Sequence, residues 1–345
     1  MKIGNFEVGK ENQVFIIAEL SANHNQDYEI AVQSIRAIKE CGADAVKLQT
    51  YTADTLTINS DKEFFKIDGT IWHGKTLYDL YQEAYTPWEW QPKLKQYAEE
   101  LGLICFSSPF DKSAVDFLDS LNVPAFKIAS FEIVDIPLIE YTASKGKPMI
   151  ISTGIANEEE IHEAVNACRK MNNNQIALLK CTSEYPAPFE ESNLNSIKYL
   201  AEKFNVIAGL SDHTLGTAVS IAAAAIGAKI IEKHFILDKK LGGPDSSFSL
   251  ESDEFKKMVD EIRIVEKALG SGLINNNIKN KSSRKFARSL FAVKDIQAGE
   301  LLSSDNIRSI RPANGLAPKY LNQVLGKKAK INIERGTPLS WDLFE

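Results

Sequence analysis

Short apolar runs alternate with amphipathic stretches from residue 14 to about residue 270. Each run has four to seven β-branched, aromatic or other apolar residues on both faces, which is typical of strands buried in a parallel sheet. The stretches between them place apolar residues at helical spacing, for example at 28–41, 89–101, 157–170 and 251–269. The predicted strands are 14–20, 45–50, 104–109, 125–130, 149–154, 176–182, 206–212 and 229–235.

Eight strand–helix repeats predict an α/β fold, a closed (β/α)8 TIM barrel. A doubly wound open sheet is the alternative, but no Gly-rich phosphate-binding fingerprint follows the first strand. The connection at 51–87 has no sustained period and is unusually long for a compact domain. Because such loops are mostly functional, we expect this segment to form a lid.

The repeat pattern stops near residue 270. Residues 271–283 are rich in Asn, Ser and Lys, which predicts a linker between a barrel domain at 1–270 and a small, mostly β module at 284–345. The module carries 11 Lys/Arg against 6 Asp/Glu, although the whole chain has a net charge of −6. An RNA-binding arm would cluster its basic residues, whereas these are scattered. The charge therefore favours a folded module that docks on the acidic body of its own or a partner chain, and no nucleic-acid partner.

Composition places the chain among globular proteins, with 44% hydrophobic and 25% charged residues. No apolar run approaches the roughly 20 residues of a membrane span, and the first residues lack the apolar core of a secretory signal. We therefore expect a cytoplasmic protein without a membrane partner. The cysteines show no CxxC pairing, so we expect buried free thiols in a reducing compartment at Cys41, Cys105, Cys168 and Cys181.

Polar residues gather at the carboxyl ends of the predicted strands, where barrels of this kind carry their functional groups. Any one of them could simply be satisfied by a neighbouring loop. Lys47 and Lys127, however, lie inside apolar strands, where an uncompensated ammonium is costly to bury. Two such lysines on different strands indicate an anionic ligand with a phosphate and a carboxylate group. Hydroxyl donors would come from Ser108, Ser130, Ser152, Ser183 and Ser211.

His213 and His234 end the last two predicted strands, which are adjacent in a barrel. Two neutral imidazoles, completed by a carboxylate or water, suit a borderline divalent cation such as Mn²⁺ or Zn²⁺. The alternative is one catalytic base and one unrelated structural histidine.

Eight motifs in order make the chain similar to the sialic acid synthase family over nearly its whole length. They are IIAELSANHN, GADAVKLQTY, SSPFD, FKIASFE, ISTGIA, CTSEYPAP, GLSDHTLG and IEKHFILDKKLGGPDSSFSLE. Residues 284–345 resemble the antifreeze-like (SAF) β-clip module that follows the barrel in that family. The resemblance implies a transferase that condenses phosphoenolpyruvate with an amino-sugar aldehyde.

The resemblance also implies roles for the strand-end residues. Lys47, Lys127 and the five serines named above would bind phosphoenolpyruvate, and His213 and His234 would hold the metal, Mn²⁺ in expectation. Glu19 would orient the aldehyde or carry a proton, unless it merely pairs with a lysine, an alternative that also applies to Asp245. The residues expected on the sugar side are Gln49, Phe131, Tyr185, Asp245 and Arg311.

In this family the C-terminal module lies over the partner's barrel in a two-fold dimer, so we expect a domain-swapped homodimer. Arg311 would then reach the N-acetyl group of the sugar bound by the partner, unless it forms a salt bridge within its own module. A narrower resemblance rests on Leu20–Ser21–Ala22, Phe106–Ser107–Ser108, the segment 129–132 and the lid. It favours 2,4-diacetamido-2,4,6-trideoxy-altrose as the sugar.

Precursors of neuraminic and legionaminic acids are the alternative sugars. Two other classes of protein stay open. One is a Schiff-base aldolase with Lys127 or Lys47 as its nucleophile. The other is a carbohydrate-binding protein that works through the C-terminal module.

Overall fold

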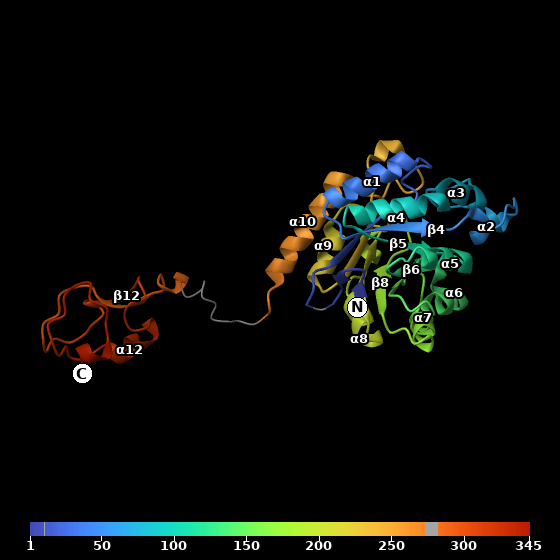
Figure 1. The fold of residues 1–345 in the computed structure, drawn as a ribbon. Helices are drawn as coiled ribbons and strands as arrows, with labels where there is room; N and C mark the ends of the chain where they lie inside the picture. Colours follow the sequence, from blue (N-terminus) through green and yellow to red (C-terminus); the bar gives the residue numbers. More distant parts are fainter. Residues whose placement is uncertain (10, 273–281) are drawn as a thin grey trace. The chain divides into compact units, whose positions relative to one another are not determined.

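The computed structural model describes residues 1–9, 11–272 and 282–345. The chain divides into two compact units, Met1–Gly270 and Ser271–Glu345, drawn in Figure 1. Most of the predicted linker, residues 273–281, lies outside the described residues.

The first unit is built on a closed barrel of eight parallel strands, in which each strand pairs with the next along the chain and β10 pairs with β3. The predicted (β/α)8 barrel is therefore confirmed, and the open sheet is wrong. Every strand lies within its predicted range. The strands are β3 (Phe15–Glu19), β4 (Ala45–Thr50), β5 (Ile104–Pro109), β6 (Phe126–Ile128), β7 (Met149–Ser152), β8 (Ile176–Cys181), β9 (Ile207–Asp212) and β10 (Ile230–His234).

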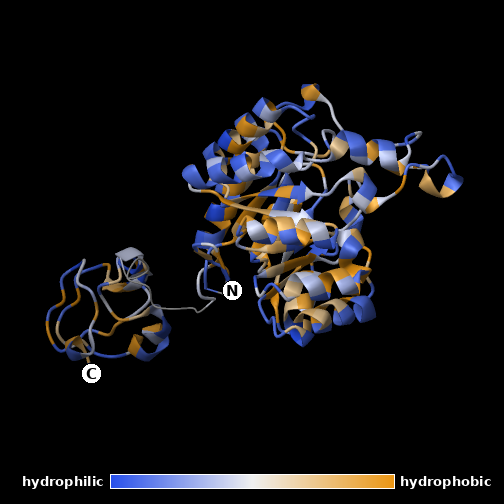
Figure 2. Cartoon of the chain, turned by 45° about the vertical axis from the view of Figure 1, so that its right-hand side comes forward, coloured by the Kyte–Doolittle hydropathy of each residue, from blue (hydrophilic) through white to orange (hydrophobic). Residues whose placement is uncertain are grey.

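Amphipathic helices surround the barrel, and the hydropathy colours of Figure 2 show mixed polar and apolar helices around a mostly apolar interior. Side-chain caps fix several helix starts: Asp27 accepts hydrogen bonds from two backbone N–H groups of α1, and Asn157 forms a capping box with Glu160. The helices are α1 (Tyr28–Glu40), α2 (Ala53–Leu56), α3 (Leu77–Ala84), α4 (Gln91–Glu100), α5 (Lys112–Ser120), α6 (Ile136–Ala143), α7 (Glu158–Lys170), α8 (Ser196–Phe204), α9 (Ala218–Ala225) and α10 (Ser252–Leu269).

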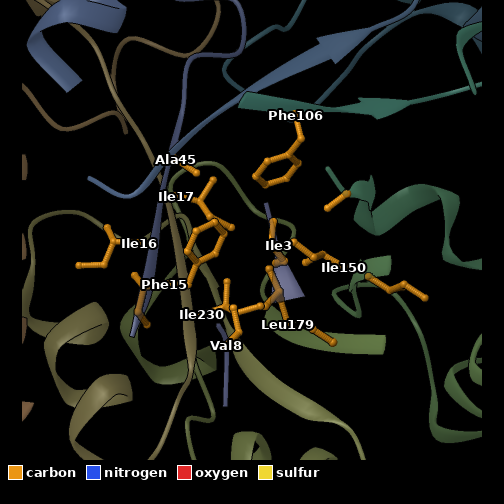
Figure 3. Packing of buried hydrophobic residues seen from close by; sticks show 14 of the residues in the cluster. Ile3, Val8, Phe15, Ile16, Ile17, Ala45, Phe106, Ile150, Leu179 and Ile230 are labelled. Carbon is orange, nitrogen blue, oxygen red and sulfur yellow. The ribbon is translucent and has the colours of Figure 1, made fainter. Parts of the chain in front are cut away.

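An N-terminal hairpin of β1 (Lys2–Ile3) and β2 (Phe6–Glu7) packs into the core at the amino ends of the strands. Ile3 is fully buried and, in Figure 3, lies beside Leu179 and Ile230 of the barrel wall. The sequence showed no strand pattern here, because two-residue strands are too short to produce one. The hairpin leaves the opposite end of the barrel for polar chemistry.

The segment 51–87 differs in part from its prediction. It contains the short helices α2 and α3, which the lack of a sustained period did not predict. Thr76 caps α3 by accepting a hydrogen bond from the Asp79 backbone N–H. The helix is short and its apolar face meets a pocket rather than the core, which explains why its period was weak.

The second unit has its own apolar core, which includes Leu290, Ile307 and Val324. Among the described residues its regular elements include the antiparallel pair β11 (Ser289–Ala292) and β12 (Ile307–Ile310), and the short helix α12 (Leu321–Val324). All four cysteines of the chain are buried and free, as predicted. No helix among the described residues is both long and apolar enough to cross a bilayer.

Candidate functional site

A buried ionic cluster lies at the carboxyl ends of the barrel strands. Glu19 of β3 faces Lys47 of β4 in the strand register, and their side chains form an ion pair. A carboxylate oxygen of Glu232, on β10, lies 3.6 Å from Lys47 Nζ and 3.9 Å from Lys127 Nζ. It also accepts a hydrogen bond of 3.1 Å from the Ser211 hydroxyl. The two lysines in apolar strands are therefore compensated by two carboxylates, which offsets their desolvation.

Burial tunes the protonation of this cluster. It raises the pKa of Glu19 to about 7, although Lys47 acts in the opposite direction. Burial acts in the same sense on Glu232, but Lys127 and Lys47 outweigh it and lower the pKa of that carboxyl. Burial also lowers the pKa of Lys127. The pKa of Glu19 therefore lies near neutral pH, whereas the pKa of Glu232 lies below its usual value.

Two of the predicted serines contact the lysines directly. Lys47 Nζ donates to Ser108 Oγ at 3.3 Å, and Lys127 Nζ donates to Ser152 Oγ at 2.7 Å. Both lysines are nearly inaccessible to solvent. The lysines and hydroxyls thus form one connected set of donors from several strands.

Ser130 and Ser183 form a second hydroxyl pair, hydrogen-bonded to each other across β6 and β8 loops. Gly154 lies against this pair, and a Cβ built on it would overlap both hydroxyl oxygens. The Cys181 sulfur would lie 3.3 Å from the same Cβ. Space for the serine pair therefore depends on glycine at position 154.

The two predicted histidines converge. The ring centroids of His213 and His234 are 5.4 Å apart. His213 Nδ1 lies 2.9 Å from the Thr182 carbonyl oxygen, so this nitrogen carries a proton. Burial lowers the pKa of His213, but the Cys181 sulfur and the Thr182 carbonyl oxygen outweigh burial and raise that pKa above its usual value. Burial, followed by the charge of His213, lowers the pKa of His234 well below its usual value, which keeps that imidazole neutral.

The donors around these rings fit a divalent cation. His234 Nδ1 is buried without a hydrogen-bond partner and lies 3.8 Å from Asp245 Oδ2. Imidazole nitrogens with a nearby carboxylate are the ligand types that manganese and zinc accept. In the part of the chain that the structure describes, however, no three His, Cys, Asp or Glu side chains form a complete metal cluster.

A pocket of about 420 Å³ opens above the cluster. Four of the predicted sugar-side residues line it, together with Ser130 and His234. Those four are Gln49, Phe131, Tyr185 and Asp245. Glu19, both lysines and three of the other serines are buried rather than part of its walls, whereas Ser183 is half-buried. Those three serines are Ser108, Ser152 and Ser211.

The segment 51–87 supplies one wall of this pocket, as a lid would. Leu77, Leu80 and Tyr81 of α3 line it. Trp72 donates its indole N–H to the Pro244 carbonyl oxygen at 2.9 Å, and its ring centroid lies 5.5 Å from that of Tyr185. The segment therefore connects the loop after β4 with the loop after β10.

Part of the site was not predicted from the sequence. Glu232 was not among the predicted site residues, although its spacing of two residues from His234 puts both side chains on one face. Glu132 also lines the pocket, its Oε2 has no hydrogen-bond partner, and burial raises its pKa to about 7. Its position two residues after Ser130 was the available signal. Tyr51 and Tyr81 lie on the lid side and gave none.

Arg311 belongs to the C-terminal unit, where it directly follows β12 and is exposed. Among the described residues it forms no ion pair, so the salt bridge within the module is not observed. Its contact with a sugar stays a prediction.

The fold defines a (β/α)8-barrel protein with a buried lysine–serine–carboxylate site at the carboxyl ends of its strands. The NeuB family model matches residues 34–273, and the SAF domain model matches residues 287–345. The chain belongs to the NeuB family, which confirms the resemblance inferred from the motifs.

Named relatives agree with this assignment. The chain is 50% identical to a pseudaminic acid synthase of Campylobacter jejuni over 98% of both chains. It is 51% identical to a pseudaminic acid synthase of Helicobacter pylori, over 96% of this chain and 97% of that one. The crystal structure of an N-acetylneuraminic acid synthetase from Leptospira borgpetersenii is similar with a TM-score of 0.74 and 32% identity, covering 82% of this chain and 94% of that chain.

Proposed function

We propose that this protein is a transferase that makes pseudaminic acid from phosphoenolpyruvate, 2,4-diacetamido-2,4,6-trideoxy-altrose and water, with release of phosphate. The observation that carries the proposal is the pair of buried lysines, Lys47 and Lys127, with serine hydroxyls around them beneath a pocket. Phosphoenolpyruvate carries one carboxylate and one phosphate, which match two ammonium groups and several neutral donors.

In the reaction, C3 of phosphoenolpyruvate attacks the aldehyde carbon, which forms the new C–C bond and leaves an alkoxide. Water then adds to the cationic C2, and its proton passes to the alkoxide. The tetrahedral intermediate collapses to a ketone as the C2–O bond to phosphate breaks, and phosphate leaves with the hydroxyl proton. Glu19, whose pKa is raised to about 7 chiefly by burial, is suited to carry a proton in these steps near neutral pH.

Lys47 and Lys127 would bind the anionic groups throughout, aided by Ser108, Ser152 and the Ser130–Ser183 pair. Glu232 limits their excess positive charge before phosphoenolpyruvate binds. His213 and His234 would hold a divalent cation, Mn²⁺ in our proposal, which when bound supplies Lewis-acid polarisation of the aldehyde oxygen. The buried, partnerless Nδ1 of His234 supports that assignment.

The pocket favours a sugar with an apolar side. Aromatic residues supply much of its wall, including Phe110, Phe131 and Tyr185. A deoxygenated, doubly N-acetylated altrose has fewer hydroxyls to satisfy than N-acetylmannosamine. The identities near 50% with pseudaminic acid synthases support the same choice over neuraminate or legionaminate production.

The experiment is phosphate release with phosphoenolpyruvate and each of three sugars: the trideoxy-altrose, the legionaminic precursor and N-acetylmannosamine. We expect the highest kcat/KM with the altrose, since a site built around one set of polar groups discriminates strongly. A higher kcat/KM with N-acetylmannosamine would contradict it. Borohydride treatment with substrate tests the Schiff-base aldolase, because only that mechanism leaves a stable lysine adduct.

We also propose a homodimer in which Arg311 of one chain serves the sugar site of its partner, as the family resemblance implies. The test mixes Arg311→Ala chains with His213→Ala chains, after mass spectrometry of tagged chains has shown subunit exchange. A mixed dimer would then contain one intact site, so activity should exceed the sum of the two parents. Exchange without any gain in activity would overturn the trans arrangement.

A further inference from the structure

Ser21 adopts a left-handed backbone conformation, with φ of 45°, in the turn just after β3. This conformation costs about 1–2 kcal/mol for a residue with a Cβ and is usually occupied by glycine or asparagine. The other non-glycine residues with positive φ in the described part of the chain are five asparagines and one glutamine, none of them buried. They are Asn25, Gln26, Asn122, Asn172, Asn193 and Asn205. Ser21 is only 3% exposed and lines the pocket.

The turn brings the polar groups of Ser21 onto two carboxylates. Its backbone N–H donates to Glu19 Oε1 at 3.1 Å. Ser21 and Asp245 both line the pocket. Burial raises the pKa of Asp245, whereas the Ser21 side chain and the Ala22 backbone N–H act on this carboxylate and lower that pKa. One turn thus ties the proton-carrying candidate Glu19 to a carboxylate from the loop after β10.

Neighbouring bonds fix the same two loops to each other. Asn23 Nδ2 donates to the Phe235 carbonyl oxygen and to Ser249 Oγ, both at 2.8 Å. Ser249 Oγ donates in turn to the Asp245 carbonyl oxygen at 2.6 Å. The backbone around Asp245 is therefore held without Ser21, and what the Ser21 hydroxyl adds is the orientation of the Asp245 carboxylate.

We propose that Ser21 is a positioning residue that determines sugar specificity by aiming the Asp245 carboxylate into the pocket. The carboxylate oxygens left free by Ser21 and Ala22 accept hydrogen bonds from hydroxyl or amide N–H groups of the amino sugar. Glycine would fit this backbone without strain but would leave the carboxylate free to turn. This inference rests on the proposed function, because it takes the pocket to be the sugar site.

The test uses two variants that separate strain from the hydroxyl. Ser21→Gly removes both, whereas Ser21→Ala removes only the hydroxyl. We expect each to raise KM for the amino sugar about tenfold, as loss of an orienting partner does, while KM for phosphoenolpyruvate changes less than about twofold. The Tm should be unchanged or higher in Ser21→Gly. Asn172→Gly, at another positive-φ position that is exposed and remote from the pocket residues, should change neither KM.

A Ser21→Gly protein with the kinetic constants of the wild type would overturn the proposal. An equal rise in both KM values would also overturn it, because that result indicates general distortion. If the wild-type protein turns over none of the three sugars, the proposed function is wrong. The positioning role is then tested separately by crystal structures of the wild type and of Ser21→Gly. A turned or disordered Asp245 carboxylate in the variant supports it, and an unchanged one refutes it.

Discussion

Two buried lysine–carboxylate clusters lie on opposite faces of the same strand, β10. The outer cluster consists of Lys233, Asp212, Thr214 and Ser220. Asp212 accepts hydrogen bonds from Lys233 at 2.9 Å, from Ser220 at 2.6 Å and from the Thr214 hydroxyl at 2.8 Å. Lys233 also donates to the Thr214 carbonyl oxygen. Every charged group of the outer cluster is therefore paired within the fold.

The inner cluster consists of Glu19, Lys47, Lys127 and Glu232. It is as deeply buried as the outer one, but Glu232 Oε2 has no hydrogen-bond partner. His234, two residues along the strand, has a buried Nδ1 that is also without one. Because buried polar atoms normally find partners, a cluster that leaves some unsatisfied is ready for a ligand. Burial of charge alone therefore does not distinguish a structural cluster from a ligand-binding one. The presence of buried polar atoms without hydrogen-bond partners does.

The largest effects should come from removing one lysine of each cluster. Lys233→Met leaves the buried Asp212 charge unpaired, so the free energy of unfolding should fall by about 3–5 kcal/mol. Lys127→Met leaves Glu232 with Lys47, so the barrel should stay folded while kcat/KM falls about 100- to 1,000-fold. Chemical denaturation and steady-state kinetics measure the two quantities. If Lys127→Met unfolds the barrel as readily as Lys233→Met does, the contrast between the clusters is wrong.

Removing a metal ligand should have the next largest effect. His213→Ala should abolish stoichiometric metal binding and lower kcat by about 100-fold or more, with little change in phosphoenolpyruvate binding, since the cation acts on the aldehyde. Elemental analysis and single-turnover kinetics read the two effects. His162→Ala, on the exposed face of α7, is the matched control and should change neither. Full activity after exhaustive chelation, with no metal bound, would refute the role of both histidines.

The two clusters show which features of the fold and site the sequence could predict and which it could not. Strand positions followed from apolar runs, and Lys47 and Lys127 stood out because a lysine in such a run is costly to bury. It was harder to predict whether a charged side chain in a strand points to the inside or the outside of the barrel. Lys233 lies in an equally apolar strand but pairs outward with Asp212, and Glu232 beside it faces inward. Only the closed register of β9, β10 and β3 settles these directions.

The lid and its partners were less predictable for a different reason. Trp72 and Tyr81 line the pocket because tertiary contacts hold their segment there. No hydrophobic periodicity in the sequence indicates this position. Glu132 gave only a weak signal, its position two residues after Ser130, because a glutamate in a loop is ordinarily solvated. The turn at Ser21 gave no local signal either, since serine seldom adopts positive φ.

A substitution at Gly154 reduces the space around the Ser130–Ser183 pair without changing any charge. In Gly154→Ala the new Cβ would press on the Ser130 and Ser183 hydroxyls, so KM for phosphoenolpyruvate should rise about tenfold, the cost of one lost hydrogen bond. Gly209→Ala is the contrasting variant, because its Cβ would meet the Ile230 backbone and the Leu179 side chain within the barrel wall. It should lower the free energy of unfolding by about 1–3 kcal/mol. An unaltered KM in Gly154→Ala would show that the serine pair does not bind this substrate.

The smallest effect concerns Glu132, a half-buried pocket residue whose Oε2 is buried and which forms no ion pair among the described residues. Burial raises its pKa to about 7, so the folded protein holds this proton more tightly than the unfolded chain does. Its contribution to stability is therefore greatest at low pH and is lost as the pH rises from about 4.5 to about 7. Glu132→Gln removes the ionisation while keeping the shape. Relative to wild type, the variant should gain on the order of 1–3 kcal/mol in free energy of unfolding between pH 5 and pH 8.

Glu29→Gln, at an exposed position on α1, is the matched control and should show no such gain. Urea denaturation of the three proteins at both pH values measures the difference. A constant offset between Glu132→Gln and wild type would mean that Glu132 stays ionised in both states, and hence that something in the fold pairs it as Asp212 is paired. A pH-dependent offset would instead place Glu132 with Glu232 and His234, among the buried groups whose bonding capacity the fold leaves for a ligand.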